Sequence, residues 1–236
     1  MQTNGIMGGL YRVSEWIMRF SVTNLLWLLC SLPVVFFVLT SLLMEDTNQL
    51  IMNFIIIAII SPFTLFPATS AMFVVVRKWL TGEEDAPLIK TFFKGYKENY
   101  VQSMLGGIIY CILFAIMIVN LNFYNQYYTD LQFLSIFILI LLAIATISLF
   151  YFFPLMVHLH LKLKELIKNA IVLTVGKPLY SLGLALTNFL ILYISFEYFT
   201  FLIIIFMGSA MAFCSYYYFN MLFQKIQTIR ENSDSE

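Results

Sequence analysis

Long apolar runs alternate with short polar segments along the whole chain. Six runs reach or approach the roughly 20 residues that a bilayer span requires, at about 22–44, 50–76, 101–119, 131–157, 179–195 and 198–223. Two polar connections, 77–100 and 158–178, and a polar tail, 224–236, complete the pattern. It predicts an all-α integral membrane protein with six transmembrane helices in a single membrane domain, 1–236. Because the run 179–195 is short, a five-span alternative that fuses the last two runs stays open.

The residues before the first run show a helical pattern of their own. Apolar side chains recur on one helix face at Ile6, Leu10, Val13, Ile17 and Phe20. Arg12, Glu15 and Arg19 share another face, with Glu15 and Arg19 one helical turn apart. The pattern predicts an N-terminal amphipathic helix in the membrane interface. A loosely held tail is the alternative.

Prolines interrupt the first two apolar runs. Pro33 lies inside the first run and predicts a kink there. The second run, 27 residues long, contains a group of prolines and hydroxyl residues: Ser61, Pro62, Thr64, Pro67, Thr69 and Ser70. Prolines free backbone carbonyls that neighbouring hydroxyls can bind, and broken helices near the bilayer centre form solute sites in transporters. These six residues are therefore candidates for a helix break and for a polar lining.

The connection 77–100 predicts a helix that lies on the membrane or on a partner. Pro87 fits its first turn, and Leu88, Phe92 and Tyr96 form an apolar stripe. The cations are arranged as a second stripe, Lys90, Lys94 and Lys97, and the connection 158–178 adds Lys164 and Lys168. These lysines are candidates for docking a partner or anionic lipid, with a merely solvated surface as the alternative.

The distribution of charge predicts the orientation. All 13 Lys and Arg residues fall in the N-terminal region, the two connections and the tail. The loops on the opposite side contain only acidic charges: Glu45, Asp46, Asp130 and Glu197. Cytoplasmic loops are enriched in Lys and Arg. Both termini are therefore predicted to be cytoplasmic.

Composition narrows the possible functions. Charged residues make up 11% of the chain, against roughly 25% in soluble domains, which argues against a soluble protein. The net charge of zero gives no support for nucleic-acid binding. The three cysteines lie in apolar runs without metal-ligand spacing, and there is no phosphate-binding GxxxxGK[ST] loop. We therefore expect no enzyme activity, no metal and no cofactor.

Polar residues within or near the apolar runs are expected to have structural roles. Asn53, Asn188 and Asn220 are expected to form hydrogen bonds between helices. His158 and His160 are two residues apart, so on a helix they diverge by about 200° and do not share a metal. We expect them to be interfacial side chains.

Four segments at boundaries and connections of the chain are specific enough to compare with known families: MGGLYRVSEWIMR (7–19), PATSAMFVVVRKWLTGEED (67–85), TFFKGYKENY (91–100) and YFFPLMVHLHLKLKELIKNAIVLTVGKPL (151–179). They resemble the YesL-like family of bacterial membrane proteins of unknown function. The resemblance implies a multi-pass protein of the bacterial plasma membrane. It also implies a frequent neighbourhood with sugar-importing ATP-driven transporters, and no catalytic residue is known for the family.

Two functional hypotheses follow. The first is a non-enzymatic component accessory to carbohydrate uptake, which binds the lipid bilayer and docks a sugar-transporter permease or regulator. The alternative is a small permease or facilitator for a neutral solute that uses the proline-broken second span.

Overall fold

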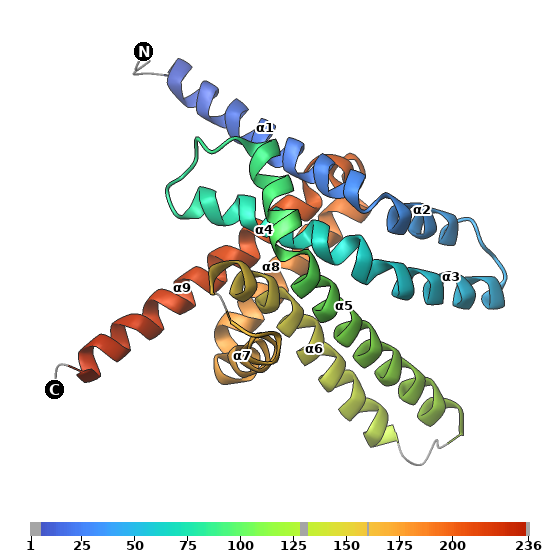
Figure 1. The fold of residues 1–236 in the computed structure, drawn as a ribbon. Helices are drawn as coiled ribbons and strands as arrows, with labels where there is room; N and C mark the ends of the chain where they lie inside the picture. Colours follow the sequence, from blue (N-terminus) through green and yellow to red (C-terminus); the bar gives the residue numbers. More distant parts are fainter. Residues whose placement is uncertain (1–5, 128–131, 160, 235–236) are drawn as a thin grey trace.

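A computed structural model describes residues 6–127, 132–159 and 161–234, and this part of the chain is helical with no strand. The ribbon is a central group of helices with long arms that extend outward (Figure 1). The elements in chain order are α1 (Ile6–Cys30), α2 (Leu32–Ser41), α3 (Thr47–Ile60), η1 (Ser61–Phe63), α4 (Leu65–Leu80), α5 (Leu88–Tyr127), α6 (Gln132–His158), α7 (Leu163–Gly176), α8 (Pro178–Glu197), the π-helical segment η3 (Ile203–Met207) and α9 (Gly208–Asp234).

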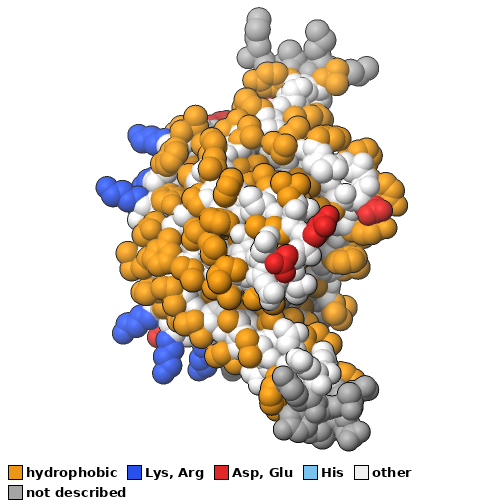
Figure 2. Space-filling model, turned by 90° about the vertical axis from the view of Figure 1, so that its right-hand side faces the viewer, with side chains coloured by type: hydrophobic (Ala, Val, Ile, Leu, Met, Phe, Trp, Pro, Cys, Tyr) orange, Lys and Arg blue, Asp and Glu red, His pale blue; other side chains and the backbone are white. Residues whose placement is uncertain are grey.

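Four described helices are long and apolar enough to cross a membrane, in α5, α6, α8 and η3–α9. Two bent pairs, α1–α2 and α3–α4, pass the same test when each pair is counted as one span, which raises the number to six. The last two predicted spans form separate helices, α8 and η3–α9, and are not fused. Apolar side chains dominate the face in Figure 2, as a lipid environment requires.

The two bends lie at predicted prolines. α1 and α2 meet at 81° beside Pro33, and α3 and α4 meet at 47° around η1, which contains Pro62. Proline lacks a backbone N–H, and its ring collides with the preceding helical turn. Pro67 lies in the first turn of α4 and causes no further break. The predicted kinks at Pro33 and Pro62 are confirmed.

Three helix boundaries differ from the prediction because no residue breaks the helix where hydropathy changes. α1 runs from Ile6 to Cys30 and joins the amphipathic segment to the start of the first span. Its placement in the membrane interface stays a prediction. α5 fuses the helix of the first connection with the third span, since no proline follows Pro87 until Pro154. α9 continues through the polar tail to Asp234.

α4 lies at the centre of the molecule, with α1, α5, α6 and α9 packed around it (Figure 1). Ala68, Ala71 and Val76 on this helix are completely buried. α5 approaches closely at Gly95 and Gly107, where an added Cβ would lie 2.8 Å from Val74 Cβ and 2.7 Å from Phe66 Cγ. Small residues at such contacts let membrane helices pack directly against each other. α4 is therefore the helix around which α1, α5, α6 and α9 are positioned.

Candidate functional site

The hydroxyl groups at the bend of the second span bind carbonyls of their own chain segment. Ser61 Oγ donates to the Ile57 carbonyl at 2.6 Å, and Thr64 Oγ1 donates to the Ile60 carbonyl at 3.2 Å. Thr69 Oγ1 donates to the Leu65 carbonyl at 2.7 Å. Ser70 Oγ donates to the Pro67 carbonyl at 2.8 Å and is fully buried. These bonds satisfy carbonyls near the break, as expected for prolines in membrane helices.

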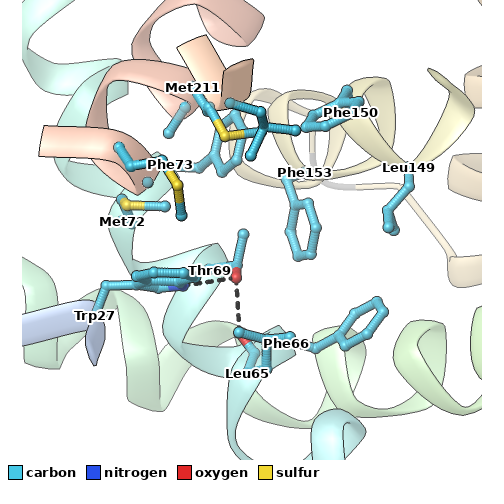
Figure 3. A pocket seen from close by; sticks show the side chains of 14 residues that line it. Trp27, Leu65, Phe66, Thr69, Met72, Phe73, Leu149, Phe150, Phe153 and Met211 are labelled. Carbon is cyan, nitrogen blue, oxygen red and sulfur yellow. Dashed lines mark hydrogen bonds between the residues drawn. The ribbon is translucent and has the colours of Figure 1, made fainter. Parts of the chain in front are cut away.

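An apolar cavity of about 250 Å³ lies beside α4, between α1, α6, α8 and α9. Figure 3 shows aromatic rings and methionine side chains around it, among them Phe73, Phe153 and Met211. Thr69 is the one member of the proline-hydroxyl group in the lining, and its Oγ1 also accepts a hydrogen bond from Trp27 Nε1 at 3.0 Å. The cavity therefore presents carbon and sulfur, and it suits an apolar group.

A second cavity, which we call the cationic pocket, lies at the other end of α4. It has a volume of about 400 Å³ and is formed by the end of α4, the loop 81–87 and the start of α5. Its charged lining residues are Arg77, Lys78, Glu83, Lys90, Lys94 and Glu98.

The acids of the cationic pocket are paired with lysines. Lys78 Nζ donates to Glu83 Oε2 at 2.8 Å, which lowers the pKa of the Glu83 carboxyl and keeps it ionised. Lys94 Nζ lies 3.8 Å from Glu98 Oε1. Arg77 Nη1 donates to the Val157 carbonyl at 2.5 Å, which ties α4 to the end of α6. The four cations exceed the two acids, so the pocket is electropositive.

The five predicted docking lysines divide into two groups. Lys90 and Lys94 line the cationic pocket. Lys97 is exposed on α5 outside this lining, and Lys164 and Lys168 are exposed on α7. Phe92, from the predicted apolar stripe, is completely buried in the core. Phe92 thus attaches the start of α5 to the core, and the lysines of α5 are exposed.

Arg19 has a structural role that sequence reasoning missed. Its residue is only 6% exposed, and Nη2 binds Glu15 Oε1 at 2.5 Å. Nη1 donates to the carbonyl of Glu84, and Asp85 Oδ1 lies 3.8 Å from the guanidinium. Arg19 therefore joins α1 to the loop 81–87 beside the cationic pocket. The pairing with Glu15 was visible in the sequence, but the contact with a loop 65 residues away was not.

Asn24 was also missed, although an amide inside an apolar run is a signal for a helix contact. It is completely buried, and Nδ2 donates to the carbonyls of Ile203 and Ile204 at 3.0 and 2.7 Å. Its Oδ1 accepts from the Ser209 N–H at 3.1 Å. Asn24 thus binds backbone groups within and just after the π-helical segment η3, where the regular helical pattern changes.

Two further polar residues connect helices, and the sequence predicted this role for Asn188 but not for His158. Asn188 Nδ2 donates to Ser215 Oγ at 3.1 Å, between α8 and α9. His158 Nδ1 lies 2.8 Å from Tyr216 Oη and its ring packs against Phe223, which joins α6 to α9. His160 lies outside the described residues. Within the described ranges, no group of three His, Cys, Asp or Glu side chains could hold a metal ion.

Comparison with known proteins places the chain among bacterial sequences without an assigned activity. Residues 20–121 match the family described as "Protein of unknown function, DUF624". The chain is 35% identical over 121 residues to the uncharacterized protein YteU of Bacillus subtilis (strain 168) and 30% identical over 109 residues to YesL of the same organism. Over these residues the chain is similar to the YesL-like proteins.

The YesL-like match is partial. It covers 51% of this chain and 43% of YteU, and 46% of this chain and 40% of YesL. No solved structure matches the chain. The family segment 20–121 includes α4, the loop 81–87 and α5. It therefore contains every charged residue that lines the cationic pocket.

Proposed function

We propose that the chain is a non-enzymatic membrane protein accessory to carbohydrate uptake through an ATP-driven transporter. In this proposal a permease or regulator of the transporter docks on the exposed lysines of α5 and α7. The YesL-like resemblance supports the link to sugar import, because such proteins are frequently neighbours of sugar-importing transporters.

The continuity of α5 is the observation that carries the docking role. Its 40 residues, at about 1.5 Å each, make a helix roughly 60 Å long, about twice the thickness of a hydrocarbon core. Its first turns therefore extend beyond the apolar layer, where Lys97 is exposed and Phe92 is buried against the core. Such a helix presents its cations on a rigid support that is continuous with a span.

The distribution of charge supports placing this surface in the cytoplasm. In Figure 2 the Lys and Arg side chains gather along the left-hand edge, and the most prominent acidic side chains lie toward the centre and right. By the positive-inside tendency, we propose a bacterial plasma-membrane protein with both termini cytoplasmic.

Affinity purification from the native host in mild detergent tests the docking role. The wild-type chain should recover a transporter subunit, and the variant Lys97→Glu/Lys164→Glu/Lys168→Glu should lose it. Arg12→Glu, a charge reversal at an exposed site on α1, is the control and should retain the subunit. Purification of the wild-type chain without any transporter subunit would refute the proposal.

The bend at η1 and the adjacent cavity favour a second candidate, a facilitator for a neutral solute. The lining of carbon and sulfur suits an apolar solute better than a sugar. Proteoliposomes containing the chain should take up such a solute faster than empty vesicles, and Met211→Trp should block the cavity and remove the difference. Equal rates in protein-containing and empty vesicles would rule this candidate out.

A further inference from the structure

The cationic pocket contains polar groups that are left without protein partners. Thr91 is 7% exposed and lines the pocket, and its hydroxyl has no hydrogen-bond partner among the described residues. Lys90 likewise forms no ion pair within the described ranges. A hydroxyl without a protein partner can donate a hydrogen bond to a ligand, and cations that line a cavity attract an anion. Glu83 and Glu98 in the lining pair with Lys78 and Lys94, so Lys90 and Thr91 are left for an anionic, hydrogen-bond-accepting ligand.

The helix that borders the pocket adds to this attraction. α5 begins at Leu88, next to Pro87, and its first turn forms part of the wall. N–H groups at a helix start have no partner within the helix and favour negative charge. Arg77, at the end of α4, also lines this space, with its Nη1 held by the Val157 carbonyl. A phosphate group has the charge and the several acceptor oxygens that such a wall can bind.

An apolar groove lies directly beside the cationic pocket. It is lined by Met18 and Val22 of α1 and by Leu88, Ile89 and Phe93 of α5. Pro87 and Lys90 belong to both linings, so the groove and the pocket adjoin along α5. Arg19, buried on α1, binds the loop 81–87 and keeps α1 next to this site.

We propose that the cationic pocket and the groove together bind one anionic phospholipid. The phosphate lies against Lys90, Thr91 and Arg77, and an acyl chain begins along Met18, Val22 and Phe93. Complementary charge selects the headgroup, and the adjoining apolar groove selects a lipid over a free phosphate. The proposal is independent of transporter docking, because it concerns the side of α5 that faces α4 and α1.

Native mass spectrometry of the purified chain tests this assignment, with phosphatidylglycerol and phosphatidylcholine as probes and inorganic phosphate as a competitor. Lys90→Gln and Thr91→Val should each weaken phosphatidylglycerol binding roughly fivefold to tenfold, with little change for phosphatidylcholine. Phe93→Ala should weaken both lipids, since it shortens the apolar groove. Lys97→Gln is the matched control, because it removes the same charge from the same helix outside the pocket.

Two results would overturn the assignment. Equal losses for Lys97→Gln and Lys90→Gln would mean that lipid binds the general surface charge of α5. Displacement of phosphatidylglycerol by inorganic phosphate, together with an unchanged Phe93→Ala variant, would assign the pocket to a free anion instead. Thermal unfolding of each variant shows whether it remains folded, and Lys90→Gln, at an exposed position, keeps the test decisive if Thr91→Val unfolds.

Discussion

α4 and the α2–α3 hairpin are held in place by different forces. Ten residues of α4 are buried, whereas α2 buries only Val34 and α3 only Asn53. The hairpin is an arm at the edge of the molecule (Figure 1), and most of its apolar side chains are exposed. Lipid tails solvate such side chains as well as a protein surface does, so apolar character alone does not bring α2 and α3 together.

A single amide provides the contact that apolar packing does not. Asn53 Nδ2 donates to the Phe37 carbonyl at 2.7 Å, and it lies 2.7 Å from Ser41 Oγ and 3.2 Å from Thr40 Oγ1. The expected role of Asn53 between helices is confirmed. Close packing therefore stabilises the centre of the molecule, and hydrogen bonds at one residue stabilise the arm.

Gly107→Ala should have the largest effect, because it attacks the packing at the centre. The added Cβ would lie 2.7 Å from Phe66 Cγ on α4, and overpacking of this kind costs about 2–3 kcal/mol. The free energy of unfolding, measured in a detergent titration, should fall by that amount. Gly9→Ala is the control, since no described atom outside its chain neighbours and the backbone of its own helix lies within 4 Å of the new Cβ, and it should be neutral or slightly stabilising. Equal effects at both glycines would refute the packing argument.

Asn53→Leu should come next and should act on the arm alone. It removes the hydrogen bonds to α2 while the apolar volume stays similar, at a cost of about 1–2 kcal/mol. Spin labels on α2 and α3 should show a wider distance distribution, with labels on α4 and α5 unchanged. Asn120→Leu is the control, because among the described residues the Asn120 amide donates only to the Ile116 carbonyl of its own helix. An unchanged α2–α3 distance in Asn53→Leu would mean that packing holds the arm as well.

Trp27→Phe tests a hydrogen bond inside the packed centre. It removes the Nε1 donor to Thr69 and should cost about 0.5–1 kcal/mol of unfolding free energy. Thr69→Val should cost a similar amount, and the double variant should cost less than the two single effects combined. Fully additive effects would show that the two side chains do not interact.

Ser61→Ala should have the smallest effect, within about 0.5 kcal/mol. Its Oγ donates to Ile57 in the preceding turn of the same segment, and that carbonyl already accepts the Ser61 N–H. The measurement is the same detergent titration. A loss above 1 kcal/mol would show that the hydroxyl is needed to maintain the bend around η1.

Local signals in the sequence predicted local features of the fold. The bends at Pro33 and Pro62 follow from the geometry of proline itself, and the interhelical bonds of Asn53 and Asn188 follow from amides in apolar runs. The change from polar to apolar residues at 100–101 did not mark a helix boundary, because hydropathy reports the surroundings of a helix and not its continuity. The predicted boundary therefore divided one helix into two.

The candidate site depended more on the tertiary arrangement. The lysine stripe of α5 was visible in the sequence, but the assignment of Lys90 and Lys94 to a pocket requires the position of Arg77 on α4. The burial of Arg19 likewise depends on the loop after α4. The polar lining predicted for the second span stays a prediction, with Thr69 as its one member in the apolar cavity.

The unbroken length of α5 has a mechanical consequence. A straight rod of roughly 60 Å that pivots at its midpoint by about ten degrees moves each end sideways by approximately 5 Å. A small change in the tilt of the span, for example when the bilayer changes thickness, therefore moves Leu88 sideways by several ångströms. Leu88 lies beside the loop 81–87 that Arg19 binds.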